Sequence, residues 1–241
     1  MLEALVPYPD LEYSAEYVAA AIAERWPALV ISFVGKRQAF ARTDAAPQGY
    51  DAVPFAVHQL QPPLAAAPDL MLIGARGWFD ADPLYFPYDG GKLLASVFPE
   101  MANGLGTRLS ALIAGGSQED LAFALSVLSA FEGKSCVYDF VRTIVAALDP
   151  GSRLLNEARS VLRESGFVSG AFGFAELHAE RKALLEPWLA DPSETVRTFA
   201  AEQIRELDRR IAAETRSAEA SIAQRKLDHG EELDGGEASA E

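Results

Sequence analysis

LADPSETVRTFAAEQIREL, residues 189–207, contains a complete helix start followed by one buried helical face. Asp191 can cap the helix, Pro192 can occupy the first helical position, where its missing N–H costs nothing, and Glu194 can reach back as in a capping box. Apolar residues then recur at spacings of four, four, three and four: Val196, Ala200, Ile204, Leu207 and Ile211. This periodicity predicts a helix with one face in the core.

The same stretch resembles the second helix of a HEAT-type repeat, the helix pair from which α-solenoids are built. The resemblance lies in Asp191-Pro192, in Val196-Arg197 and in the small and aliphatic residues that follow on one face. Another Asp-Pro pair begins 42 residues earlier, at Asp149, within the roughly 40 to 47 residues of HEAT and armadillo units. The resemblance covers the C-terminal part of the chain only. It implies that Asp191 and Arg197 bond between neighbouring units; an Arg197 that faces solvent is the alternative.

Helical periodicity and capping residues also run through most of the preceding chain. Residues 28–34 are ambiguous, because their short β-branched run is typical of a strand while their apolar spacing fits a helix, which we favour. Five prolines between residues 41 and 68 predict a connector. The helices expected beyond it cover 69–78, 92–98, 100–113, the segment from a Ser117 cap to Phe131, 135–148, the segment from Asp149-Pro150 to near Gly166, and 174–189.

The last helix is expected to continue without a break for about 50 Å from Ser193, at 1.5 Å per residue. Beyond Ile211 its apolar stripe thins to Ala218 and Ile222, which leaves too little apolar area to hold it on its own domain. We therefore predict a docking element for a partner or another copy of the chain, with Arg216 and Ile222 as contact residues. A solvated helix held by ion pairs along its surface is the alternative.

These patterns predict an all-α protein, an irregular HEAT-like helical stack with a long C-terminal helix and an acidic tail. We divide the chain into an N-terminal helical segment and proline-rich connector at residues 1–68, a HEAT-like helical domain at residues 69–229, and the tail at residues 230–241. The tail contains five acidic residues and no basic one, which predicts disorder.

Composition limits the kinds of partner. The 241 residues carry a formal net charge of −14, which disfavours binding to nucleic acid and favours a basic protein partner. No apolar run reaches the roughly 18 to 20 residues of a membrane span, and the first residues lack the basic flank and apolar core of a signal peptide. Together with the single Cys136 and the abundant Ala and Arg, these features predict a bacterial cytoplasmic protein without membrane contact.

Residues 78–89 have the most distinctive chemistry. They include three carboxylates: Asp80, Asp82 and Asp89. They also include four aromatic residues that we take as candidate partner contacts: Trp78, Phe79, Tyr85 and Tyr88. The carboxylates could bind a divalent cation or act as acid and base, whereas the aromatic side chains could form a recognition surface. Packing of the aromatic rings between helices, with the aspartates as caps, is the simplest interpretation.

Cys136 and His178 could act as nucleophile and base, but neither lies in a recognisable motif, and a small buried thiol is favoured. No pattern indicates a metal site or a cofactor, and we expect neither. The sequence therefore favours a non-enzymatic scaffold or adaptor for protein–protein interactions. One alternative is an acidic inhibitor, of the immunity type, that binds a basic toxin or enzyme. The other is a metal-dependent hydrolase that uses Asp80, Asp82 and Asp89.

Overall fold

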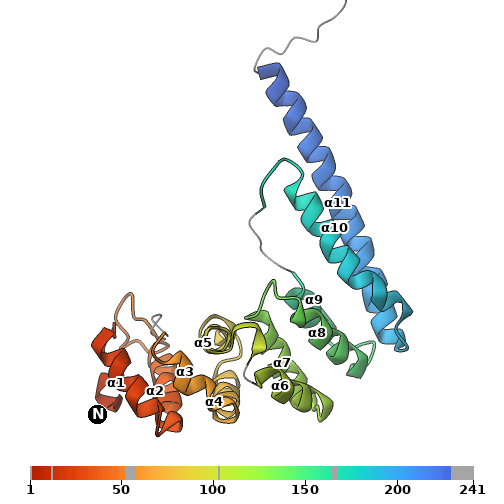
Figure 1. The fold of residues 1–241 in the computed structure, drawn as a ribbon. Helices are drawn as coiled ribbons and strands as arrows, with labels where there is room; N and C mark the ends of the chain where they lie inside the picture. The colour runs from red at the N-terminus through yellow and green to blue at the C-terminus, as the bar shows by residue number, and fades with distance from the viewer. Residues whose placement is uncertain (1, 12, 53–57, 103, 164–167, 229–241) are drawn as a thin grey trace, which may run out of the picture. The chain divides into compact units, whose positions relative to one another are not determined.

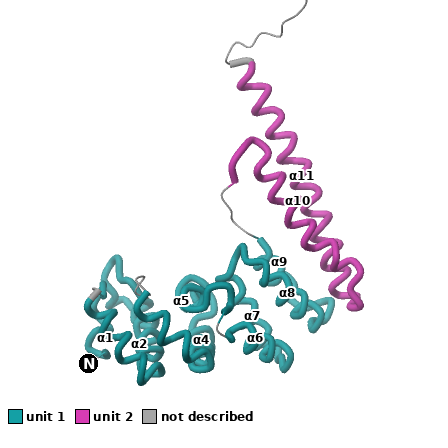
Figure 2. The backbone as a smooth tube through the Cα atoms, viewed as in Figure 1, with its two compact units in different colours: residues 1–164 teal, residues 165–241 magenta. Residues whose placement is uncertain are grey.

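The protein is all-α in a computed structural model that describes residues 2–11, 13–52, 58–102, 104–163 and 168–228. Within these residues all regular secondary structure is helical and no strand occurs, which confirms the all-α prediction. The chain forms two compact units, residues 1–164 and 165–241 (Figure 2). The boundaries expected from the sequence, after residues 68 and 229, differ from this division. The predicted tail lies outside the described residues.

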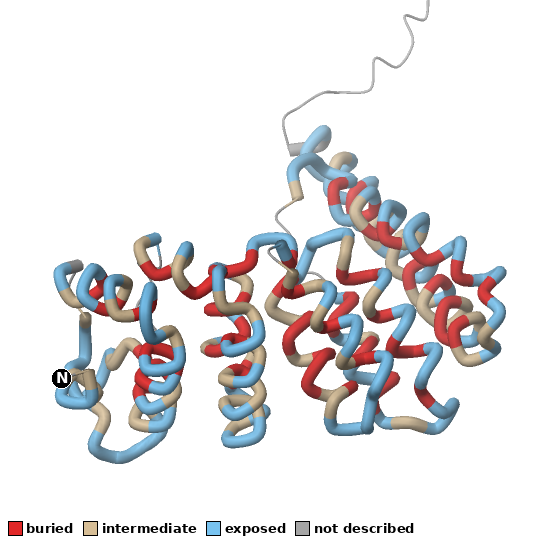
Figure 3. The backbone as a smooth tube through the Cα atoms, turned by 60° about the horizontal axis from the view of Figure 1, so that its bottom comes forward, coloured by how far each residue is buried: buried red, intermediate tan, exposed pale blue. Residues whose placement is uncertain are grey.

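The first unit consists of short helices that pack side by side (Figure 1). Its α-helices are α1 Tyr13–Ala23, α2 Pro27–Phe40, α3 Gln61–Ala65, α4 Pro68–Ala81, α5 Gly90–Val97, α6 Leu105–Ala114, α7 Gln118–Ser129, α8 Cys136–Ala147 and α9 Leu154–Val161. Its 3-10 helices are η1 Leu2–Leu5, η2 Phe86–Tyr88 and η3 Pro99–Met101. Helix α2 packs against α1 and α4, and α7 packs against α6, α8 and α9. In Figure 3 the buried positions lie mainly where helices face one another.

The ambiguous residues 28–34 belong to α2, so the favoured helix is confirmed. Pro27 stands at the helix start, where its fixed φ suits the first turn. Val30, Ile31 and Val34 are buried and share one helical face, which packs between neighbouring helices. Tertiary burial on a helical face therefore outweighs the β-propensity of this short run.

Two predicted helices begin later than the sequence indicated. Asp149-Pro150 does not open a helix, because α9 starts only at Leu154, whose N–H donates to Ser152 Oγ at 3.3 Å. The helix expected over 100–113 is interrupted, and α6 starts at Leu105 after Gly104 at φ 82°. That left-handed conformation is open to glycine at little cost and stops the preceding turn.

The second unit is a helical hairpin of α10 Gly173–Leu185, the 3-10 helix η4 Glu186–Ala190 and α11 Glu194–Asp228 (Figure 1). The predicted face of α11 is confirmed at Val196, Ala200, Ile204 and Leu207, which are buried, whereas its last member, Ile211, is half-buried. Trp188 of η4 stacks on Phe199 with a ring-centroid distance of 6.2 Å. Helix α11 is unbroken over 35 residues, or about 52 Å.

The start of α11 differs from the predicted capping box. Helix α11 begins at Glu194, so Pro192 precedes it and does not occupy its first turn. The Asp191 Oδ1 accepts the Ser193 N–H at 2.8 Å and forms a turn, while the Ser193 Oγ accepts the Val196 N–H at 3.5 Å. The residue that caps the helix is therefore Ser193, with Asp191 positioning the turn before it.

The predicted docking portion of α11 is partly packed within the structure. Ala218 is only 6% exposed, so the expectation that everything beyond Ile211 lies outside the core is wrong. Arg216 is exposed and Ile222 is half-buried. Helix α11 continues past the first residue of α10 (Figure 1), so its last turns extend beyond the hairpin. Within the described ranges, no helix combines the length and apolar character that a membrane crossing requires.

Candidate functional site: an aromatic loop fixed by Arg42

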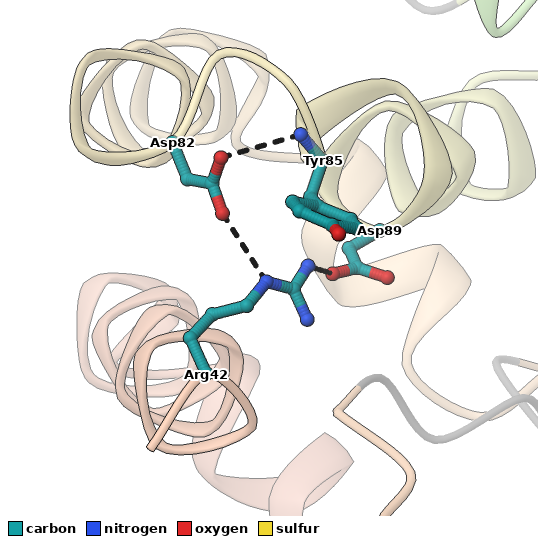
Figure 4. A network of polar contacts seen from close by, with 4 residues as sticks. All are labelled: Arg42, Asp82, Tyr85 and Asp89. Atoms are coloured by element: carbon teal, nitrogen blue, oxygen red, sulfur yellow. Dashed lines mark hydrogen bonds and ion pairs between the residues drawn. The ribbon is translucent and has the colours of Figure 1, made fainter. Parts of the chain in front are cut away.

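The loop between α4 and α5 is fastened at both ends by one arginine (Figure 4). Arg42, just after α2, donates from Nε to Asp82 Oδ2 at 3.2 Å and from Nη2 to Asp89. Its guanidinium lies 4.3 Å from the centre of the Tyr85 ring. The other oxygen of Asp82 accepts the Tyr85 N–H at 3.3 Å. Partial burial lowers the pKa of Arg42, but the hydrogen bonds to Asp82 and Asp89 and the charges of these two carboxylates together raise it by more, so the guanidinium stays charged.

The large aromatic and apolar residues at the end of α4 and in the loop that follows it divide into an inward and an outward set. Phe79 and Phe86 form a cluster with Phe123 of α7, with ring-centroid distances of 5.4 to 5.8 Å. Edge and tilted ring packing of this kind contributes stability beyond the buried area. The outward set has Leu84 at 73%, Tyr85 at 48% and Tyr88 at 64% exposed. Inward phenylalanines therefore hold a loop that presents tyrosine and leucine to solvent.

Trp78 belongs to the packed side of this region. It is half-buried, and its indole lies against Gly35 of α2 and Gly90 at the start of α5. A Cβ added at Gly90 would lie 2.8 Å from the Trp78 ring and 2.9 Å from Phe86, closer than real Cβ contacts. Of the four predicted aromatic contacts, the structure thus leaves Tyr85 and Tyr88 exposed and places Trp78 and Phe79 in packing.

The three carboxylates that the sequence singled out do not form one site. Asp82 and Asp89 are bound by Arg42, whereas Asp80 pairs with Arg76 Nε at 2.8 Å. Arg76 also binds Asp120, and this hydrogen bond lowers the pKa of that carboxyl. Among the residues that the structure describes, no group of three His, Cys, Asp or Glu side chains could hold a metal ion. The aspartates therefore act as anchors for arginine.

A groove of about 1340 Å³ lies beside the loop in the first unit. One wall is formed by Phe79, Asp80 and the turn that carries Leu84. The other walls come from one face of α7 and from α9 with the turn before it. Its apolar surface is accompanied by four carboxylates and one guanidinium: Asp80, Glu119, Asp149, Glu157 and Arg153. The sequence did not indicate this groove, because its walls lie far apart along the chain.

Cys136 and His178 lie in different compact units. Burial raises the pKa of the Cys136 thiol, which keeps it protonated, whereas the thiolate is the nucleophilic form. Burial, followed by the charges of Arg181 and Arg210, lowers the pKa of His178. Both side chains therefore have the properties of packed residues.

The Asp191 and Arg197 pair fastens the turn before α11. Arg197 Nη1 donates to the main-chain carbonyls of Asp191 at 2.7 Å and Pro192 at 2.9 Å. These hydrogen bonds link residues within one turn. The predicted bonding of this pair between repeats stays a prediction.

Arg37 is a structural residue that the sequence reasoning missed. It is fully buried, and its guanidinium donates to four main-chain carbonyls, those of Leu5, Val6, Tyr8 and Asp51. The Tyr50 ring lies 4.6 Å from the same group. The signal was an arginine in register with the apolar face of α2, which indicates a buried cation that needs acceptors.

Comparison with known proteins yields no relative. No protein-family model, no curated protein and no solved structure matches the chain.

Proposed function

We propose that this chain is a non-enzymatic scaffold that binds a partner protein through the loop of residues 82–89. The observation that carries the proposal is the fastened loop, in which Arg42 holds Asp82 and Asp89 while Leu84 and Tyr88 point to solvent. Large side chains on a restrained loop bury much area while losing little conformational freedom on binding. Tyrosine is also enriched among residues that dominate binding energy.

Affinity capture with matched variants tests this proposal. We expect proteins captured by the parent chain to be lost with the double variant Leu84→Ala and Tyr88→Ala. The control is Leu29→Ala with Tyr8→Ala, which removes a leucine and a tyrosine of comparable exposure, 56% and 58%, elsewhere in the same unit. Identical recovery by the two double variants would refute a role for the loop.

Neutralisation of a basic protein is a second candidate function. It is favoured by the groove beside the loop, where carboxylates outnumber the single guanidinium. In this case the captured partner would be basic, and its activity would fall when the parent chain is added. If the captured partner keeps its full activity at a saturating concentration of the parent chain, inhibition is contradicted and the scaffold function remains.

A further inference from the structure

The length of the groove along α7 suits a short helix. Groove-lining residues of α7 fall at positions 118, 119, 122, 125, 126 and 129, which is one helical face. This face spans about 16 Å at 1.5 Å per residue, the length of three helical turns.

The base of the groove is apolar. Leu125, Leu154 and Val161 are buried beneath it, and the small side chain of Ala122 leaves room above α7. Phe79 and the exposed Leu84 complete the apolar wall on the side of the aromatic loop. Such a surface fits the apolar face of an amphipathic helix, whose anchors recur every three or four residues.

The charges around the base determine whether a positively or a negatively charged occupant is favoured. Glu119, Asp149 and Glu157 are exposed, and none of them has an ion pair with another described residue. Asp80 is already paired with Arg76. Arg153 also lines the groove, so three unpaired carboxylates accompany one guanidinium there, and this excess of negative charge attracts a cationic partner and repels an acidic one. The chain's own net charge of −14 also disfavours a second copy as the occupant.

From these observations we infer that the groove binds a basic amphipathic helix of about three turns, whose apolar face covers the base while Lys or Arg side chains meet Glu119, Asp149 and Glu157. This inference rests on the proposed function, because it specifies the partner segment that lies next to the aromatic loop. The loop and the groove share Leu84, so one partner can contact both.

A designed peptide provides the probe. It is an acetylated and amidated helix-forming 14-mer, about four turns long, with leucines at helical spacing flanked by lysines. The control peptide replaces each lysine by glutamate. We expect the lysine peptide to bind the full chain in the micromolar range by fluorescence anisotropy, at least tenfold more tightly than the glutamate peptide, and to weaken as salt rises.

Charge reversals locate the site. The groove variant is Glu119→Lys with Glu157→Lys, and its matched control is Glu24→Lys with Asp44→Lys, two exposed acids of the same unit outside the groove. Both change the net charge equally. We expect about a tenfold or greater loss of peptide affinity for the groove variant and less than about a twofold loss for the control. Because Glu119 and Glu157 lie in first helical turns, melting curves of both variants confirm that the fold is retained.

Ala122→Phe tests the apolar base without changing charge. The larger side chain fills the groove above α7, so binding of the lysine peptide should be lost while the fold is retained. Two peptide results would overturn the inference: equal losses of affinity in the two charge variants, or undiminished binding of the lysine peptide to Ala122→Phe. A third is dimerisation of the parent chain that the groove variant abolishes, because the occupant would then be a second copy. The proposed function fails separately, when capture does not depend on Leu84 and Tyr88 although the peptide binds.

Discussion

Replacing Arg42 by Met should release the loop without unfolding the unit. The substitution removes ion pairs to Asp82 and Asp89 and the contact with the Tyr85 ring. The Arg42 side chain is 35% exposed, so each ion pair contributes at most about 1 kcal/mol and the ring contact a similar amount. We expect the free energy of opening the loop to fall by about 2 kcal/mol, which increases the population of the open loop about 30-fold.

Amide hydrogen exchange measures this release directly. The N–H groups of Tyr85, Phe86, Tyr88 and Asp89 are hydrogen-bonded within the loop. Their exchange should accelerate about 30-fold in Arg42→Met, if the opening population limits exchange. Partner capture should weaken in the same variant, because the partner must then order the loop. Arg42→Lys should behave similarly, since one ammonium cannot match the bidentate guanidinium.

Arg76→Met is the matched control for this prediction. Arg76 also bridges two aspartates, Asp80 and Asp120, and its guanidinium lies 5.5 Å from the centre of the Phe123 ring. It makes no contact with Asp82 or Asp89, so loop exchange should stay close to the parent value. If Arg42→Met accelerates the loop amides no more than about threefold, or if Arg76→Met accelerates them equally, the loop is not held by Arg42.

Three further predictions concern stability. Arg37→Met should lower the free energy of unfolding by at least about 3 kcal/mol in chemical denaturation, because four main-chain carbonyls lose a buried charged donor. Burial, and then the charge of Arg181, lowers the pKa of His178, so the unfolded chain binds a proton more readily than the folded one. The melting temperature should therefore fall as the pH drops below about 6.5, and His178→Leu should lose this pH dependence. Ala218→Glu should destabilise the hairpin by about 2 kcal/mol in thermal melts, whereas Ala220→Glu, at an exposed position, should not.

The helices could be predicted because their signals are local. The stripe from Val196 to Leu207 follows from spacing alone, and the structure buries it as expected. The ends of helices are less determined by local sequence. Both Asp191 and Ser193 are good capping residues, and only the folded turn shows that Ser193 caps while Asp191 holds the turn. The same ambiguity applies to Asp149-Pro150, which precedes α9 without starting it.

The outward portion of α11 shows a different limit. Its stripe looked too thin to be packed, because Ala218 contributes little apolar area by itself. A small residue also allows close approach of another segment, and Ala218 is buried. Apolar area along one helix therefore does not decide burial, since burial also depends on what packs against it.

The candidate site depends on contacts between distant residues, which explains why the sequence indicated its location but not its organisation. Arg42 lies 40 residues before Asp82 and 47 before Asp89, and no local pattern marks it as the residue that fastens their loop. The sequence-based helix ends at residue 78, one residue before Phe79, and a loop has no periodicity to show that Tyr85 points outward, so the sequence does not distinguish the two. Phe123 and Arg42 make the difference: the first packs against the phenylalanine and the second lies over the tyrosine. The carboxylates that suggested metal chemistry are thereby committed to arginine, while the unpaired acids lie in the neighbouring groove.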